Sequence, residues 1–399
     1  MRVLSASFDV FPGVKGACTH INAFAQALAL EFQEVHLVTI QNNNGEWLEE
    51  SKRVVAELSE QGILHHGFQC VGRNVIDRAL SYRRHFRAWL RTAGSFDAVH
   101  VRSIFEGYPI AKRKDEFCRF FVFECNGLPS IELKYHYPKV AEDDELLIKL
   151  RHQETYCMQQ ADLIVTPSTV TKEYLISLGI DADKIQVIPN GVDLDVFTYA
   201  PAVLPSSRNE SLKLLYSGTM TSWQGVNVAI DALRLLRRDL RAELLLVGPT
   251  KKSQRKKLEQ YIFEQELSNY VTLMPPVKQT DLVGLHHQAD VFLAPLPSND
   301  RNVVQGCCPL KILEGMACGI PIVATDLAVV RELAQADEDI IMVKPNSAKA
   351  IKDGILKICH EPRLATSISV SARKKIEDQF QWKHAQEHLR TCYRTLLSR

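Results

Sequence analysis

The residues best suited to chemistry gather in the stretch Gln305–Thr325, which reads QGCCPLKILEGMACGIPIVAT. A loop of glycine and small residues leads to Pro309, which we expect at the first position of a helix. Free backbone N–H groups at a helix start, together with the helix dipole, make an anion site suited to a diphosphate. The segment of Cys308, Pro309 and Leu310 is therefore expected to contact such a ligand.

Two charged residues follow within this expected helix. Lys311 falls in its first turn, where a cation is unfavourable unless an anion lies beside it. Glu314 comes one turn later and can accept hydrogen bonds from ribose hydroxyls. The alternative is an ordinary surface pair of Lys311 and Glu314 at i,i+3 spacing, worth a few tenths of a kcal/mol. Gly319 is expected to end the helix, and Pro321 to begin a buried strand.

These residues must be positioned by a larger framework, in which short β-branched runs alternate with segments of helical period. This pattern is typical of βαβ units around a parallel sheet, and so of the α/β class. The first half is expected to hold strands at 2–8, 35–40, 97–101, 119–124, 162–166 and 185–188, and helices near 18–31, 75–92, 141–160 and 168–178.

The alternation pauses at 199–211, where two prolines and three serines indicate a linker. It then restarts, with strands expected at 212–217, 243–247, 271–274, 290–294 and 320–324, and helices at 225–238, 252–266, 279–287 and 309–318. We expect no strand beyond about residue 344. The prediction is two domains, 1–198, completed by the C-terminal helix 382–399, and 199–381.

Composition limits the class of protein. The 399 residues exceed what one core usually holds, and 48 Lys+Arg against 47 Asp+Glu leave no global field to attract nucleic acid or an anionic membrane. No stretch approaches the ~20 apolar residues of a membrane span, and the N-terminus has no core of a secretion signal. The ten cysteines are scattered without a Cys-x-x-Cys pair, so most are expected to be reduced and buried. We expect a cytoplasmic, soluble protein.

Several motifs resemble one family. Besides Gln305–Thr325, they are Ala161–Ser168 (ADLIVTPS), Val187–Asp193 (VIPNGVD), Tyr216–Thr219 (YSGT) and Ala289–Pro295 (ADVFLAP). Together they are similar to the retaining GT-B glycosyltransferases of the family 4 type, also called glycosyltransferase group 1. The resemblance covers most of the chain and is weakest between about 41 and 95 and from 126 to 150.

The resemblance implies two Rossmann-like domains that face an interdomain cleft, the GT-B fold. It also implies transfer of a hexose from a nucleoside-diphosphate sugar to a hydroxyl acceptor, with retained anomeric configuration, and without a metal or another cofactor. Two alternatives stay open. The first is a nucleotide-sugar epimerase of GT-B-like fold, and the second is a non-catalytic nucleotide-sugar-binding protein. The base, sugar, acceptor and oligomeric state are not identified by the sequence.

The chain departs from the family pattern at the charged positions. The arginine and lysine that the family carries after the first strand of the second domain read Thr219 and Gln224 here, close to Gly218. The first glutamate of the family motif is replaced by Gly306. Because backbone amides alone leave a buried diphosphate uncompensated, we expect Lys311 and Arg301 to replace the missing cations.

The first domain supplies the remaining candidates. The family uses the loop between the first strand and first helix against the donor phosphate, which implicates Gly13, Lys15 and Gly16. Glu124 and Asn126, the latter at a position where the family often has histidine, are expected on the acceptor side, and with Lys311 they are the predicted catalytic residues. The alternative for Glu124 is a capping or salt-bridged carboxylate. In the second domain, Val277 is expected to line the base pocket.

Three further features have a structural and a functional interpretation. His20 is expected to cap or pack in the first helix. Asp193-x-Asp195 imitates a metal-binding pair, but its place after Asn190-Gly191 favours a structural turn. The helix at 78–91 has five arginines with Tyr82, Phe86 and Trp89 between them. It is expected to be a core-packed helix with a solvated basic face, and the alternative is peripheral contact with the inner face of a membrane.

Overall fold

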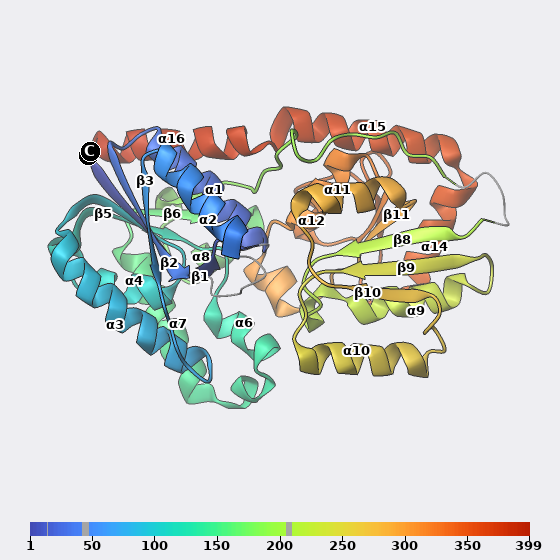
Figure 1. Ribbon diagram of the computed structural model, residues 1–399, viewed down its shortest axis with the longest axis horizontal. Helices are drawn as coiled ribbons and strands as arrows, with labels where there is room; N and C mark the ends of the chain where they lie inside the picture. Colours follow the sequence, from blue (N-terminus) through green and yellow to red (C-terminus); the bar gives the residue numbers. More distant parts are fainter. Residues whose placement is uncertain (14, 42–47, 205–209) are drawn as a thin grey trace. The chain divides into compact units, whose positions relative to one another are not determined.

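The computed structural model describes residues 1–13, 15–41, 48–204 and 210–399, without the side chains of 48 and 50 (Figure 1). The described chain divides into two compact units. Unit 1 comprises Met1–Pro189 and Lys383–Arg399, and unit 2 comprises Asn190–Trp382. The changeover falls at Pro189, whereas the sequence placed it at 198/199. Of the expected linker 199–211, residues 205–209 lie outside the described residues.

Unit 1 is built on a parallel sheet of buried, β-branched and aromatic strands. In space the strands follow the order β3-β2-β1-β4-β5-β6-β7. Their bounds are β1 (Arg2–Phe11), β2 (Glu34–Gln41), β3 (Ile63–Phe68), β4 (Phe96–Val101), β5 (Cys118–Glu124), β6 (Leu163–Thr166) and β7 (Ile185–Val187). The central strands are nearly continuous apolar runs, as expected where helices cover both faces of a parallel sheet.

Helices flank this sheet, and several begin at capping side chains. Asn74, Ser103 and Ser168 each accept a backbone N–H from the first turn of the helix that follows. The helices are α1 (Gly16–Ala29), α2 (Leu48–Glu60), α3 (Val75–Ala93), α4 (Ile104–Ala111), α5 (Lys114–Phe117), α6 (Pro129–His136), α7 (Asp144–Gln160), α8 (Thr169–Ser177) and α16 (Trp382–Leu397). The strand β3 and helices α2, α4, α5 and α6 were not expected from the sequence.

Unit 2 repeats the architecture, with the strand order β10-β9-β8-β11-β12-β13, all parallel. Its strands are β8 (Leu212–Ser217), β9 (Ala242–Val247), β10 (Val271–Met274), β11 (Val291–Ala294), β12 (Ile322–Thr325) and β13 (Ile341–Val343). The bounds of β8 to β12 agree with the expected strands within a few residues. The strand β13 was not among the expected strands, although it ends just before 344, beyond which none was expected. The α/β class is thereby confirmed.

The helices of unit 2 are α9 (Val226–Leu236), α10 (Lys252–Glu264), α11 (Gln279–Gln288), α12 (Leu310–Cys318), α13 (Ala328–Arg331), α14 (Ala348–His360) and α15 (Pro362–Gln379), with a π-helical turn η5 (Arg301–Gln305). Helix α12 starts at Leu310, so Pro309 is the N-cap and not the first helical residue as expected. Gly319 ends α12 in the left-handed conformation, with φ of 81°.

Both sheets reverse their strand order at one point, between β1 and β4 in unit 1 and between β8 and β11 in unit 2. Open parallel sheets bind ligands beyond the carboxyl ends of the strands at such a point. The loops that follow β1, β4, β8 and β11 are therefore the places to look for a site. Among the described residues, no helix is long and apolar enough to cross a membrane.

Candidate active site

Lys311 is the centre of the site in unit 2. It lies in the first turn of α12, is only 9% exposed, and donates hydrogen bonds from Nζ to the Tyr216 hydroxyl (2.9 Å) and to Gln224 Oε1 (2.6 Å). The Tyr216 hydroxyl in turn donates to the Thr219 carbonyl oxygen (2.7 Å). Lys311 thus bridges the loop after β8 and the helix after β11, across the reversal of strand order.

The charge of Lys311 is unusually easy to remove. Burial, with a smaller contribution from the neighbouring Arg301, lowers its pKa from 10.5 to about 7, against the opposing effect of Glu314. Burial likewise raises the pKa of Glu314 to about 7, against the effect of Lys311. A buried amine held by two neutral oxygens lacks a full counter-charge, so a bound anion would stabilise its ammonium form.

Two glycines allow this arrangement. Gly218 has φ of 136°, and a Cβ there would lie 2.8 Å from Lys311 Nζ. Gly248, after β9, has φ of 143°, and its Cβ would lie 2.1 Å from the Gly218 carbonyl oxygen. Both contacts are too close for a side chain, so the position of Lys311 depends on glycine at these two places.

Arg301 lies on η5, the turn that leads towards α12. Its neighbour Asn302 is buried and donates from Nδ2 to the carbonyl oxygens of Trp223 (3.0 Å) and Pro297 (2.8 Å), which fixes the turn. The guanidinium of Arg301 is centred 5.9 Å from the ring of Trp223. Because Arg301 also contributes to the lowered pKa of Lys311, the two cations lie in one electrostatic environment.

The approach to α12 is fixed by the backbone. Gly306 has φ of 81°, which favours glycine where the family has glutamate. Asn190 donates from Nδ2 to the Cys308 carbonyl oxygen (2.7 Å). Within the described structure no side chain caps α12 at Pro309, so the helix start is left for another acceptor.

The other candidates of unit 2 lie beyond neighbouring strand ends. Thr219 follows β8, and Val277, half-buried, follows β10. Two further residues were not identified from the sequence. Ser217 is the last residue of β8, and Thr250 follows β9. In the part of the chain that the structure describes, their hydroxyl oxygens are buried without a hydrogen-bond partner. A hydroxyl side chain at the end of an apolar strand, or a few residues beyond it, was the signal that could have identified them.

A second network lies at the strand ends of unit 1, centred on Glu124, which is 1% exposed at the end of β5. Its Oε1 accepts from Arg102 Nε (2.9 Å) and from Asn126 Nδ2, and its Oε2 pairs with His100 Nε2 (2.8 Å). Arg102 Nη1 also reaches Asp9 Oδ2 (3.2 Å). Arg102 therefore links β1 to β4 across the strand reversal.

The neighbours of Glu124 hold its carboxyl group in the charged form. Burial alone would raise the pKa of Glu124, but Arg102, His20 and His100 outweigh it and hold that pKa far below its usual range. Burial lowers the pKa of His20 to about 3. The Tyr393 hydroxyl, from α16, lies 2.8 Å from His100 Nδ1. Arg102, His100 and Tyr393 were missed by the sequence analysis, because nothing in the spacing relates residue 393 to residue 100.

The loop after β1 and the start of α1 carry the remaining candidates, Gly13, Lys15 and Gly16, which are exposed; Val14 lies outside the described residues. Lys15 is the N-cap of α1 and, among the described residues, its side chain makes no capping hydrogen bond. The structure thus places these residues at the carboxyl edge of the unit 1 sheet, just beyond the end of β1, the strand that carries Asp9.

Other interpretations from the sequence can be placed in the same way. Asp193 Oδ1 accepts the Asp195 backbone N–H (2.9 Å), which is a turn, as expected. No group of three or more His, Cys, Asp or Glu that could hold a metal occurs among the described residues. Cys18, Cys118, Cys125 and Cys318 are free and buried, as predicted.

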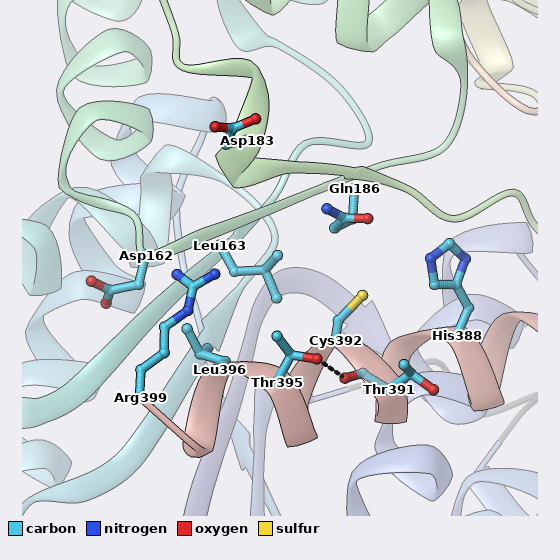
Figure 2. Close-up of a pocket in the computed structure, with 10 residues that line it drawn as sticks. All are labelled: Asp162, Leu163, Asp183, Gln186, His388, Thr391, Cys392, Thr395, Leu396 and Arg399. Atoms are coloured by element: carbon cyan, nitrogen blue, oxygen red, sulfur yellow. Dashed lines mark hydrogen bonds between the residues drawn. The ribbon is translucent and has the colours of Figure 1, made fainter.

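Figure 2 shows a pocket elsewhere in unit 1, between α16 and the edge of the sheet. Asp162 and Asp183 lie at the amino ends of β6 and β7, opposite to the edge where ligands bind in such sheets. Asp162 is already paired with Lys114 Nζ (2.7 Å) and accepts the Phe121 N–H (2.7 Å). Because the pocket lies at the amino edge and its Asp162 is already paired, we do not assign the active site to it.

Comparison with known proteins identifies the family of the chain. The model of the Glycosyltransferase Family 4 matches residues 14–196, and that of the glycosyl transferases group 1 matches residues 205–375. The putative colanic acid biosynthesis glycosyltransferase WcaL of Escherichia coli is 29% identical over 228 residues, 56% of this chain and 54% of the relative. A D-inositol 3-phosphate glycosyltransferase of Pseudarthrobacter chlorophenolicus is 31% identical over 174 residues, 41% of this chain and 39% of the relative. The matches thus span about half or less of these curated relatives.

Solved structures show the same fold. Sucrose-phosphate synthase from Thermosynechococcus elongatus matches with a TM-score of 0.79 at 19% identity, over 100% of both chains. Anabaena HepE in complex with UDP-glucose matches with a TM-score of 0.75 at 16% identity, over 99% of this chain and 100% of that one. From the family models and these folds together, the chain belongs to the group 1 glycosyltransferases and has the GT-B fold.

Proposed function

We propose that the protein transfers a hexose from a nucleoside-diphosphate sugar to a hydroxyl acceptor. The observation that carries this proposal is the buried ammonium of Lys311, held by Tyr216 and Gln224 at the start of α12. A cation with a lowered pKa at a helix N-terminus is stabilised by an anion, and a diphosphate is the anion that a glycosyltransferase releases. HepE, a structural neighbour, was solved with UDP-glucose.

In this proposal Gln224 does not replace the missing lysine of the family but positions a substitute. Its Oε1 accepts from Lys311 Nζ, so that the cation reaches the loop after β8 from α12. Arg301 supplies the second positive charge. Val277 and Glu314 contact the nucleoside, and the α12 amides after Cys308 and Pro309 contact the diphosphate.

The reaction breaks the bond between the anomeric carbon and the diphosphate oxygen and forms one to the acceptor oxygen. The electron pair leaves with the nucleoside diphosphate, and the acceptor hydroxyl proton passes to that product or to solvent. Lys311, Arg301 and helix amides stabilise the departing charge, the role that a metal ion fills in other enzymes. We therefore propose metal-independent transfer with retention of anomeric configuration.

Unit 1 is proposed to bind the acceptor and the reacting sugar through Gly13, Lys15, Gly16 and Asn126. Glu124 is enclosed by Arg102, His100 and Asn126. We propose that it acts as a positioning residue that orients Arg102 and Asn126. A catalytic contact of Glu124 with substrate would need one of these partners to move.

A thermal-shift panel of UDP, GDP, ADP and TDP tests the proposal first, because a ligand that binds the folded state raises its stability by mass action. The preferred nucleotide sugar is then incubated with an acceptor panel, and the product anomer is assigned by NMR, with chelator in parallel. Binding without turnover on any acceptor would favour a non-catalytic sensor. Conversion of donor alone would favour an epimerase, and loss of activity restored by manganese would refute metal independence.

A further inference from the structure

The outward face of α3 is strongly basic. We propose that with this face the protein binds a bilayer surface that carries anionic lipids. Between residues 71 and 93 the sequence has six arginines and one acidic residue, Asp77, while the whole chain has a formal charge of only +1. The excess is therefore local. The proposal stands apart from the nucleotide site and does not depend on the identity of the donor.

The inward face of α3 is used by the fold. Tyr82, Phe86 and Leu90 are buried in the core of unit 1. Arg83 turns inward as well and donates to the carbonyl oxygens of Phe105 (2.8 Å) and Ile104 (2.8 Å). The aromatic residues that suggested membrane contact in the sequence thus pack inside, as in the core-packed interpretation. Membrane contact must come from other residues.

The outward face carries a different set. Ile76, Leu80, Arg84, Arg87 and Arg91 are all exposed, and their spacing of four, four, three and four places them in one stripe along the helix. In Figure 1, α3 lies at the outside of unit 1. Within the described chain, the guanidinium groups of the three arginines make no hydrogen bond and no ion pair. Their charge is therefore available to a partner.

The stripe also has an apolar end. Ile76 is 50% exposed and Leu80 is 57% exposed. Val71, which precedes the helix, is 77% exposed and donates its backbone N–H to Ser81 Oγ (3.4 Å), so it lies beside the second turn of α3. Large apolar side chains next to arginines suit the boundary between lipid headgroups and acyl chains, where both are accommodated.

This combination favours a membrane over other partners. A symmetric dimer through the stripe would bring the arginines of two copies against one another, because a two-fold interface repeats the same patch. A nucleic acid would use the arginines but leave Val71, Ile76 and Leu80 in water. An anionic bilayer uses both. Each cation near such a surface raises partitioning about fivefold, so three contribute on the order of 100-fold.

Cosedimentation with vesicles tests the proposal. The full chain is mixed with phosphatidylcholine vesicles that contain or lack phosphatidylglycerol, at low and raised salt. We expect binding only with phosphatidylglycerol, weakened by salt. Changing Arg84, Arg87 and Arg91 to Glu should reduce partitioning by at least the factor of about 100. Changing Ile76 and Leu80 to Ser should weaken binding without removing its salt dependence.

A matched control separates local from global charge. Lys252, Lys256 and Lys257 are exposed on α10, and changing them to Glu alters the net charge by the same amount. This variant should bind like wild type. Unchanged thermal stability and nucleotide response would show that each variant is folded. The proposal is overturned if the binding of wild type to vesicles does not depend on phosphatidylglycerol. It is also overturned if the α10 variant loses as much vesicle binding as the α3 variant, or if the substitutions in α3 convert a dimer into a monomer.

Discussion

The lowered pKa of Lys311 makes donor binding depend on pH in a way that can be measured. In the free protein the amine has a pKa of about 7, so at pH 8 it is mostly neutral. A bound diphosphate stabilises the ammonium form and raises that pKa, so binding takes up a proton. Affinity should be constant below pH 7 and should fall as pH rises above it. The slope approaches tenfold per pH unit, about 1.4 kcal/mol, until the pKa of the complex is reached.

The assay is isothermal titration of the preferred nucleotide sugar between pH 6 and about 9. Neither phosphate of a nucleotide sugar titrates in this range, since each carries one ester and one anhydride bond and keeps only one, strongly acidic, ionisable oxygen. Over two pH units the dissociation constant of wild type should rise by up to about 100-fold. Lys311→Met keeps the aliphatic stem and removes the charge, so its affinity at pH 7 should fall by about 1.5–3 kcal/mol, or more than tenfold. Its binding should no longer depend on pH.

The same substitution, which should weaken donor binding, is expected to increase the stability of the free protein. Lys311 is protonated in the unfolded chain up to pH 10.5 but only up to about pH 7 in the folded one, so its burial costs stability at neutral pH. The free Lys311→Met protein should therefore unfold at a higher temperature than wild type at pH 7. A wild-type dissociation constant that changes less than threefold between pH 7 and 9, or a retained slope in Lys311→Met, would refute the reasoning.

Three other substitutions test the surroundings. Gly218→Ala places a Cβ 2.8 Å from Lys311 Nζ at a left-handed φ, so donor affinity should fall more than about tenfold, and a change under threefold in titration would contradict this. Glu124→Gln leaves the Arg102 charge buried without its main partner and should cost about 3–5 kcal/mol in chemical unfolding; a loss below about 1 kcal/mol would show that the network relaxes. Asn302→Ala removes two hydrogen bonds of η5 and should lower the free energy of unfolding by about 1–3 kcal/mol. It should also weaken donor binding, because η5 loses order. An unchanged donor affinity and an unchanged unfolding midpoint would be the contrary result.

Much of the fold was accessible from the sequence because its strands are short apolar runs with a clear period. The strands β8 to β12 of unit 2 were located within a few residues, and the stop at Gly319 followed from the need for a left-handed residue. Prediction was poorer between about 41 and 70 and between 102 and 136. There, β3 is only partly buried and α6 has no clear apolar face, so neither leaves a periodic signal.

The sequence by itself predicted an anion beside Lys311, because a cation in the first turn of a helix opposes the dipole. Its resemblance to the family indicated that Thr219 and Gln224 leave a charge to be replaced. Only the tertiary structure decided how the replacement works. Gln224 accepts from Lys311 across 87 residues of sequence separation, and Tyr393 meets His100 across 293. Such pairs are set by strand order and helix packing, which bring together atoms that no local pattern relates. For the same reason the sequence showed six arginines near α3, but only the packing of the helix decided which of them face outward.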